Sequence, residues 1–226
     1  MAQQAGLKPL TEIEFFADVD RRTVDRVLAA AKPRHVAAKQ EILAMGEPAT
    51  NFFLLESGRA QYYRVSESGT EISLCVLTQG NVLGLSALLK QKMACPASAA
   101  AVTDCDLLVW TKATMRGLVA KHPQLMENAL RIALAYLKRY MERHLNVMTK
   151  TAEQRLAITL LDLARRMGRA RPEGIEIETT NEQISCLADI TRFTTSRLLK
   201  NFERSGVVSK RRGKVVIHSP EALAIG

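Results

Sequence analysis

The sequence lacks any run of about 18 apolar residues, the length that a membrane-spanning helix needs. It also lacks the basic flank and apolar stretch of a secretory signal, because it begins Met-Ala-Gln-Gln-Ala-Gly. We therefore expect no membrane partner and a cytoplasmic location. Cysteine is scarce as well. The four residues, Cys75, Cys95, Cys105 and Cys186, form no CxxC pair, which favours reduced, buried thiols over disulfides.

Patterns on which enzymes depend are missing too. The sequence contains no P-loop and no GxGxxG, and its serine, histidine and cysteine spacings suggest neither a catalytic triad nor a metal site. We expect no catalysis, no metal and no resident cofactor. With 47% apolar and 24% charged residues the chain is typical of a folded protein, and 226 residues favour two domains at about 150 residues each.

Positive charge is concentrated near the carboxyl end. The formal net charge is +9, and residues 192–214 hold eight basic residues against one acidic residue, Glu203. Such a concentration is typical of a surface that neutralises phosphates. A solvated charged surface is the alternative until the structural context is known.

The first half of the chain is predicted to be rich in strands. After one helical stretch, 20–31, short β-prone runs extend to about Met115, and four glycines between 46 and 80 separate them at intervals of eleven or twelve residues. This spacing predicts an antiparallel sandwich or barrel, which suits a sensor or ligand-binding module.

A long helix is predicted over 125–148, because Pro123 lies near its first turn and no glycine or proline interrupts it. Apolar side chains recur along it at steps of three and four residues: Leu130, Leu134, Leu137, Met141, Leu145 and Met148. So narrow and long a stripe resembles a coiled-coil seam, which predicts a symmetric homodimer. The alternative is a helix packed wholly against its own domain.

Two helices joined by a tight turn are predicted in the last third of the chain. Thr180 stands three residues before Gln183, as in a capping box, and the short helix that follows ends at Asp189, whose small polar side chain tolerates a left-handed backbone. A second helix is predicted over 192–203, with a hairpin over 207–217.

With a helix over 152–167 and a strand over 174–179 before it, this order predicts a winged helix-turn-helix. Its second helix would enter the major groove of DNA, and basic residues of the hairpin would contact flanking phosphates. The residues expected to contact DNA are Thr180, Thr191, Arg192, Phe193, Thr195, Ser196, Arg197, Lys200, Lys210, Arg211, Arg212 and Lys214.

Four segments resemble the bacterial Crp/Fnr family, named for the cyclic-AMP receptor protein and the fumarate and nitrate reduction regulator. Residues 46–47, 53–58 and 80–84 are similar to sequence markers of the family's cyclic-nucleotide-binding-like β-roll, and residues 191–200 are similar to its recognition helix. The order of roll, long helix and helix-turn-helix is more specific than any one segment.

The resemblance implies an α+β chain of three parts. These are an N-terminal double-stranded β-helix (jelly-roll) sensor domain over 1–121, a dimerisation helix over 122–148 and a winged helix-turn-helix DNA-binding domain over 149–226. It also implies a homodimeric transcription regulator that binds a near-palindromic operator in double-stranded DNA under effector control, with RNA polymerase as a further candidate partner. The alternative is a winged helix that binds a protein instead of DNA.

A candidate effector pocket follows from the same resemblance: Val82, Gly84, Leu85, Ser86, Cys95, Ser98, Tyr140 and Met141. Members that bind cyclic AMP have Gly-Glu-Leu where this chain has residues 84–86, Arg-Ser or Arg-Thr at 95–96, and a hydroxyl pair at 140–141. A buried phosphate without a cation is costly, so we expect cyclic AMP not to bind.

Other effectors stay open. The family's oxygen sensors hold an iron-sulfur cluster on amino-terminal cysteines, which this chain lacks before Cys75. Haem would need an axial ligand, and the histidines are isolated: His35, His122, His144 and His218. An apolar small molecule and a filled core are equal alternatives for the pocket.

The recognition helix departs from its family too. Members that read a TGTGA half-site have a glutamate where this chain has Phe193, and a phenyl ring cannot accept a hydrogen bond from cytosine. Phe193 can instead contact a thymine methyl group. Arg192 and Arg197 stay candidate guanine readers, and we expect a different half-site.

Overall fold

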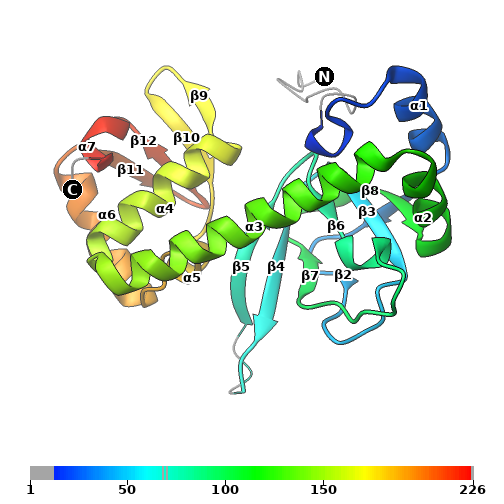
Figure 1. Cartoon of the computed structure of the whole chain (residues 1–226). Coiled ribbons are helices and arrows are strands. Elements are labelled where there is room, and N and C mark those ends of the chain that lie inside the picture. The colour runs from blue at the N-terminus through cyan, green and yellow to red at the C-terminus, as the bar shows by residue number, and fades with distance from the viewer. Residues whose placement is uncertain (1–12, 68, 70, 225–226) are drawn as a thin grey trace. The chain divides into compact units, whose positions relative to one another are not determined.

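The computed structural model describes residues 13–67, 69 and 71–224, which belong to two compact units, Met1–Arg139 and Tyr140–Gly226 (Figure 1). The first unit holds the β-roll and the second the winged helix-turn-helix, which confirms the predicted α+β class. The division between the units falls within one helix. Of the helices in the described part of the chain, none is long and apolar enough to cross a membrane.

Two four-stranded antiparallel sheets make up the roll, in the strand orders β1-β8-β3-β6 and β2-β7-β4-β5. The elements of this unit are η2 (Glu14–Phe16), α1 (Arg21–Ala29), β1 (Lys32–Val36), β2 (Glu41–Leu43), β3 (Asn51–Ser57), β4 (Ala60–Val65), β5 (Glu71–Leu77), β6 (Val82–Leu83), η3 (Leu85–Leu88), β7 (Ser98–Ala101), β8 (Cys105–Thr111), α2 (Lys112–Lys121) and the first part of α3 (Pro123–Thr149).

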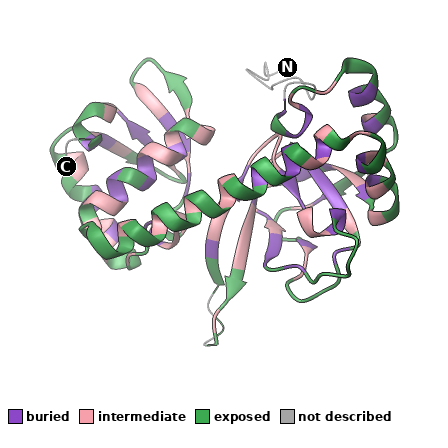
Figure 2. Ribbon diagram, viewed as in Figure 1, coloured by how far each residue is buried: buried purple, intermediate pink, exposed green. Residues whose placement is uncertain are grey.

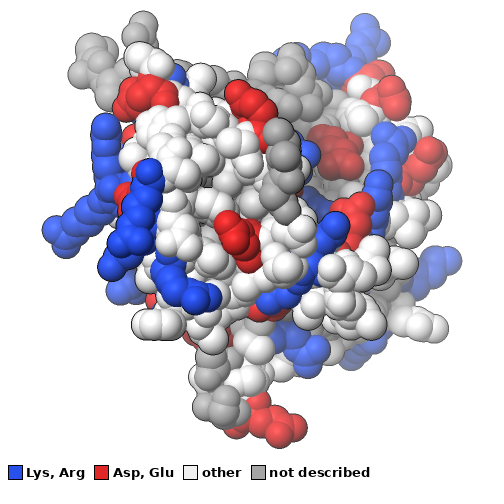
Figure 3. All heavy atoms as spheres, turned by 90° about the vertical axis from the view of Figure 1, so that its left-hand side faces the viewer, with Lys and Arg blue, Asp and Glu red and all other residues white. Residues whose placement is uncertain are grey.

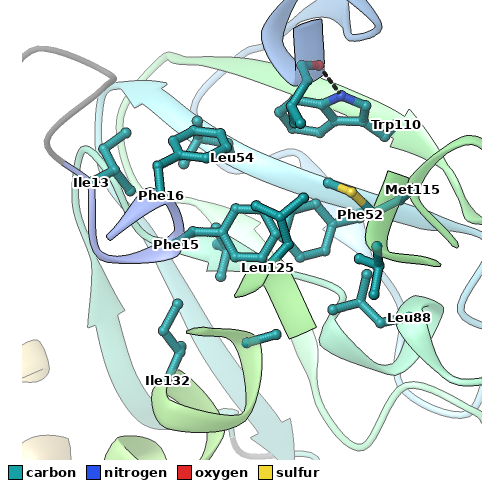
Figure 4. Packing of buried hydrophobic residues seen from close by; sticks show 14 of the residues in the cluster. Ile13, Phe15, Phe16, Phe52, Leu54, Leu88, Trp110, Met115, Leu125 and Ile132 are labelled. Atoms are coloured by element: carbon teal, nitrogen blue, oxygen red, sulfur yellow. Dashed lines mark hydrogen bonds between the residues drawn. The ribbon is translucent and has the colours of Figure 1, made fainter. Parts of the chain in front are cut away.

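Aromatic side chains fill the core where the helices cover the roll (Figure 4). The ring of Phe52 in β3 packs between those of Phe15 and Trp110, with centroids 4.8 and 5.8 Å away. The indole Nε1 of Trp110 donates to the carbonyl of Val27 at 2.8 Å, so its one polar group is satisfied. Asn128 of α3 is fully buried and donates to two carbonyls near η2, which fixes α3 against this core.

The strands end earlier than predicted. Strand β8 stops at Thr111, whose hydroxyl accepts from the N–H of Thr114 at 3.2 Å and caps α2. The prediction of strands to about Met115 is therefore wrong over the last four residues. Gly117 inside α2 weakens the helical signal in the sequence, because glycine costs about 1 kcal/mol relative to alanine in a helix.

The second unit packs four helices around a four-stranded sheet of order β11-β12-β10-β9. Its elements are α4 (Ala152–Met167), β9 (Arg169–Arg171), β10 (Gly174–Glu178), α5 (Asn181–Ala188), α6 (Arg192–Arg204), β11 (Val208–Arg211), β12 (Lys214–Ile217) and α7 (Pro220–Ala224). The predicted helices and hairpin are confirmed within one residue, and β9 is an addition. Figure 2 shows buried positions lining the inner faces of α4 and the sheet.

Candidate nucleic-acid interface and sensor interior

Side-chain caps determine where both helices of the helix-turn-helix begin. The hydroxyl of Thr180 accepts from the N–H of Gln183 at 3.2 Å, and the Gln183 side chain accepts from the N–H of Thr180 at 3.1 Å, which confirms the capping box. Asp189 has the expected left-handed backbone, with φ 52°. Thr191 then caps α6 by accepting from the N–H of Thr194 at 3.1 Å.

One face of α6 is open to solvent. Phe193 is 80% exposed, and Arg197 and Lys200 follow at steps of four and three residues, so the three share a face. Arg204 continues this face and was not predicted. Thr195 lies on the opposite side, where it is fully buried and its hydroxyl donates to the carbonyl four residues earlier at 3.1 Å. The prediction that Thr195 contacts DNA is therefore wrong.

Two predicted contact residues flank this face and already have partners within the unit. The Arg192 guanidinium contacts the carboxylate of Glu182 in the first turn of α5, and both side chains are exposed. The Ser196 hydroxyl accepts from Nδ2 of Asn181 at 2.9 Å. Sequence reasoning missed Glu182 and Asn181, because a capping box locates the start of α5 but not the side chains that lie beside α6.

The wing has both free and engaged cations. Its residues 210–212 are exposed around the turn at Gly213, as predicted, although Arg211 lies 3.5 Å from a carboxylate oxygen of Glu173. Lys214 is different: its Nζ lies 3.1 Å from Glu176, which is buried and also contacts Arg171 at 3.2 Å.

Glu176 gives Lys214 a structural role. The hydrogen bond from Lys214, and then that from Arg171, lower the pKa of Glu176 below its usual value, so the carboxylate stays charged. A buried carboxylate is costly without its partners, so the partly exposed Lys214 stabilises Glu176. Lys214 is thus an engaged cation of the wing, and its contact with a phosphate stays a prediction.

Four predicted cations have no acidic partner among the residues that the structure describes: Arg197, Lys200, Lys210 and Arg212. In Figure 3, which views the side of the second unit, extended lysine and arginine side chains project from the surface with acidic side chains among them. Acidic residues of the same unit thus neutralise three of the eight cations in 192–214, and these four residues and Arg204 stay without an acidic partner in the described part of the chain.

The apolar stripe of α3 lies on the surface of the chain. All six of its side chains are exposed, from 52% at Leu137 to 72% at Met148. The buried residues of α3 lie in its first three turns and on another face: Leu125, Asn128, Ala129 and Ile132. Figure 2 shows the exposed positions along α3. Burying a leucine gains about 2 kcal/mol, so an exposed stripe of this length is typical of an interface.

The predicted pocket residues of the roll are mostly core. Val82 and Cys95 are buried in apolar clusters, and the Ser98 hydroxyl accepts from the N–H of Met45 at 2.9 Å. Gly84 has φ 76°, and a Cβ there would lie 2.4 Å from the carbonyl oxygen of Asn51, so only glycine fits. Leu85 and Ser86 are partly buried in η3 beside it.

Tyr136, rather than Tyr140 or Met141, faces the roll. Tyr140 and Met141 are 65% and 61% exposed, so this structure does not bury them in a pocket, and their place there stays a prediction. The Tyr136 ring meets that of Tyr62 edge-on at 6.3 Å, and the Arg139 guanidinium lies 4.7 Å above Tyr136.

The Tyr62 hydroxyl is enclosed by the roll. It accepts from the N–H of Gly84 at 3.3 Å, and burial raises its pKa above the usual value of tyrosine, so it stays protonated. Cys95 is similar in kind: burial raises the pKa of its thiol, which makes it an inert core residue. Among the described residues no lysine or arginine is buried.

A β-roll, a long helix with an exposed apolar stripe and a winged helix-turn-helix with a basic face together define a DNA-binding regulator with a sensor module. Comparison with known families agrees with this class. The family described as a cyclic nucleotide-binding domain matches residues 33–122, and that described as a Crp-like helix-turn-helix domain matches residues 154–224. The chain belongs to the Crp/Fnr family of transcriptional regulators.

Named relatives are regulators as well. The global nitrogen regulator of Synechocystis is 28% identical over 185 residues, covering 79% of this chain and 81% of that protein. The fumarate and nitrate reduction regulatory protein of Salmonella typhimurium is 25% identical over 203 residues, covering 89% and 80%. A CRP-like cAMP-activated global transcriptional regulator of Mycobacterium tuberculosis is 22% identical over 217 residues, covering 95% and 96%. None of these names is that of an enzyme.

Solved structures share the fold. FixK2 from Bradyrhizobium japonicum aligns with a TM-score of 0.76 at 19% identity, covering 86% of this chain and 96% of that one. The c-di-GMP responsive regulator CLP of Xanthomonas campestris aligns with a TM-score of 0.75 at 19% identity, covering 88% and 99%. Identities this low support the fold alone, so the effector and the operator have to be inferred from the residues of this chain.

Proposed function

We propose that this transcription regulator acts as a homodimer on a two-part, near-palindromic operator, with α6 of each protomer in a major groove. The exposed face of α6 carries the proposal, because Phe193, Arg197 and Lys200 share it and two of them are cations without a partner in the described part of the chain. Arg197 is suited to reading guanine, and Lys210 and Arg212 are suited to holding phosphates. Such a protein works in the cytoplasm, beside the chromosome.

Homodimerisation through α3 is supported by its stripe. Six exposed apolar side chains at steps of three and four residues form a seam that a second copy of the same helix would cover. An interface of this symmetric kind places two recognition helices about 34 Å apart, one turn of DNA. RNA polymerase is a further proposed partner, which the protein would contact if it activates transcription.

Effector control without cyclic AMP is proposed for the roll. A cyclic phosphate buried there would need a cation; no lysine or arginine is fully buried among the described residues, and the partly buried Arg139 is stacked on the Tyr136 ring. Tyr62 and Tyr136 already meet inside the roll. A ligand that replaces or rearranges these rings would be apolar or aromatic. Haem has less support, because His35 and His122 have side-chain partners elsewhere.

Selection of bound fragments from random-sequence DNA tests the proposal most directly. We expect a palindrome whose half-sites differ from TGTGA, and a relaxed preference at one position for Arg197→Ala. Arg212→Ala should instead weaken binding to all sequences, and it should lower the salt dependence by about 0.9 per lost contact in each protomer. No enriched sequence, or salt-independent binding to a protein partner, would favour the protein-interaction alternative.

A further inference from the structure

Two arginines outside the helix-turn-helix contact its turn. Arg143, near the end of α3, donates from Nε to Oδ2 of Asp189 at 2.6 Å and from Nη2 to Oδ1 at 2.8 Å, a two-point contact with one carboxylate. Its Nη2 also donates to the carbonyl of Cys186. Arg155 of α4 donates to the carbonyl oxygens of Ala188 at 3.0 Å and Asp189 at 3.1 Å.

These acceptors lie at the carboxyl end of α5. The last carbonyl groups of a helix have no partner within the helix, and a cation there also meets the negative end of the helix dipole. The side chains of Arg143 and Asp189 are 22% and 35% exposed, against 68% and 60% for the surface pair of Arg192 and Glu182. Water and salt therefore screen the Arg143–Asp189 pair less.

The connection from α3 to α4 is braced as well. Only two residues separate these helices, and Nη1 of Arg155 donates to the carbonyl of the first, Lys150, at 2.9 Å. The N–H of Lys150 donates to the carbonyl of Asn146 in α3 at 2.9 Å. Because Arg143 ties the same stretch of α3 to Asp189, the end of α3 is held to the turn before α6 from two sides.

The apolar stripe runs through this same stretch. Met141, Leu145 and Met148 are exposed within two turns of Arg143. We propose that Arg143 is a positioning residue, which couples the dimer seam to α6 through Asp189 and so sets the spacing that the two half-sites of the operator must have. This inference rests on the proposed function as a dimer on a two-part operator. A loose connection between α3 and the turn before α6 would let the two recognition helices bind half-sites at several spacings. A rigid connection favours a single spacing.

Operators with altered spacing test the inference. Affinity is measured for the full chain on the selected operator and on duplexes whose half-sites are moved by one or two base pairs. Asp189→Asn removes the charge but keeps a residue that tolerates a left-handed backbone. Arg143→Lys keeps the charge and loses the two-point geometry, and Arg143→Ala loses both. Arg165→Ala is the matched control, because Arg165 is exposed on α4 and has no partner in the described part of the chain.

We expect wild type and Arg165→Ala to lose affinity steeply when the spacing changes. In Asp189→Asn and Arg143→Ala the loss of affinity on changed spacing should be smaller by a factor of about three or more, which is the scale of coupling between contacting residues. In Arg143→Lys this loss should be intermediate. The double variant Arg143→Ala with Asp189→Asn should show the same spacing dependence as either single variant. Half-site preference and sedimentation as a dimer should not change, which separates this role from one in folding.

Amide hydrogen exchange gives a second readout without DNA. Amides of residues 140–149 should exchange faster in Asp189→Asn than in wild type, while those of α6 keep their rates. Unchanged spacing dependence and unchanged exchange in Asp189→Asn would overturn the role of the pair and leave the dimeric function intact. A wild-type protein indifferent to spacing would instead overturn the two-part operator, and this inference with it.

Discussion

At the scale of single residues, Phe193 stands out on the recognition face. It is 80% exposed, the largest value among the exposed large apolar side chains of the described residues. An aromatic ring held in water on a helix that carries unpaired cations is typical of a contact residue. In a major groove the ring can contact a thymine methyl group, and it has no acceptor for the amino group of cytosine.

Phe193→Glu should change which base is read. The carboxylate can accept from cytosine N4, so we expect a gain of about 1 to 3 kcal/mol for cytosine over thymine at the facing position, measured on operators that differ at that base pair. Phe193→Ala is the control, since it removes the ring without adding an acceptor. Equal preferences in Phe193→Glu and Phe193→Ala would show that this position does not face a base.

The pair of His35 and Asp106 on the roll should make stability depend on pH. Asp106 accepts from His35 at 2.9 Å and from Ser57 at 2.7 Å. The hydrogen bond with Asp106 raises the pKa of His35 above 6.5, and that with His35 lowers the pKa of Asp106 below 3.8. The stabilisation by His35 is therefore complete below the pKa of this group in the unfolded chain, and it is lost as pH rises through the raised pKa in the folded protein. The stabilisation by Asp106 is lost only as pH falls through its lowered pKa in the folded protein.

His35→Gln should thus lower the denaturation midpoint of the roll at about pH 5.5 and have little effect at about pH 8.5. Fluorescence of Trp110, the one tryptophan of the chain, reports on this unit alone. His144→Gln, on the exposed side of α3, is the control. A larger effect at the higher pH would reverse the sign of the argument and contradict it.

At the scale of elements, the two parts of helix α3 have different roles. Its first part is buried against the roll, with Asn128 satisfied by the carbonyls of Phe15 and Ala17, at 3.0 and 2.7 Å. Its later part offers an apolar stripe on one side and Arg143 on another. The same helix therefore serves the sensor, the dimer seam and the turn before α6.

Leu137→Glu should separate the dimer. The side chain is 52% exposed in the single chain, so the protomer should fold as before, but the new carboxylate would be buried unpaired in the seam. We expect the dissociation constant of the dimer to rise about tenfold or more, measured by sedimentation velocity. Arg131→Glu, which places the same carboxylate off the stripe, should stay dimeric. A dimeric Leu137→Glu would move the interface elsewhere.

At the scale of the whole molecule, the sensor and DNA-binding units use charge in opposite ways. The roll encloses Tyr62 and thiols such as Cys95 without a buried cation among the described residues, whereas the second unit gathers cations and neutralises some from within by Glu173, Glu176 and Glu182. A regulator built this way attracts DNA at one unit, and we expect its other unit to be unsuited to a buried phosphate.

Calorimetric titration should therefore show no binding of cyclic AMP up to about 1 mM. The reason is the desolvation of the cyclic phosphate, which no buried cation repays. Affinity for the selected operator, measured with and without the nucleotide, should also be equal. Micromolar binding would contradict the prediction and require a rearranged roll.

Local patterns account for what the sequence alone could predict. The capping box at Thr180, the turn at Asp189, the helix over 152–167 and the wing depend on neighbours within a few residues, and all are found in the structure. The stripe on α3 follows from helical periodicity. Helix α2 was missed because Gly117 and a short apolar face hide its local signal.

The sequence by itself thus determined the order of the main parts, the family and the recognition helix, because each rests on short-range patterns. Only the tertiary structure decided which charges are free, through the contact of Glu176 with Lys214, which of the tyrosines of α3 faces the roll, and that Arg143 holds Asp189. Those contacts join residues far apart in the chain. Their geometry depends on how elements pack, which no single stretch of sequence specifies.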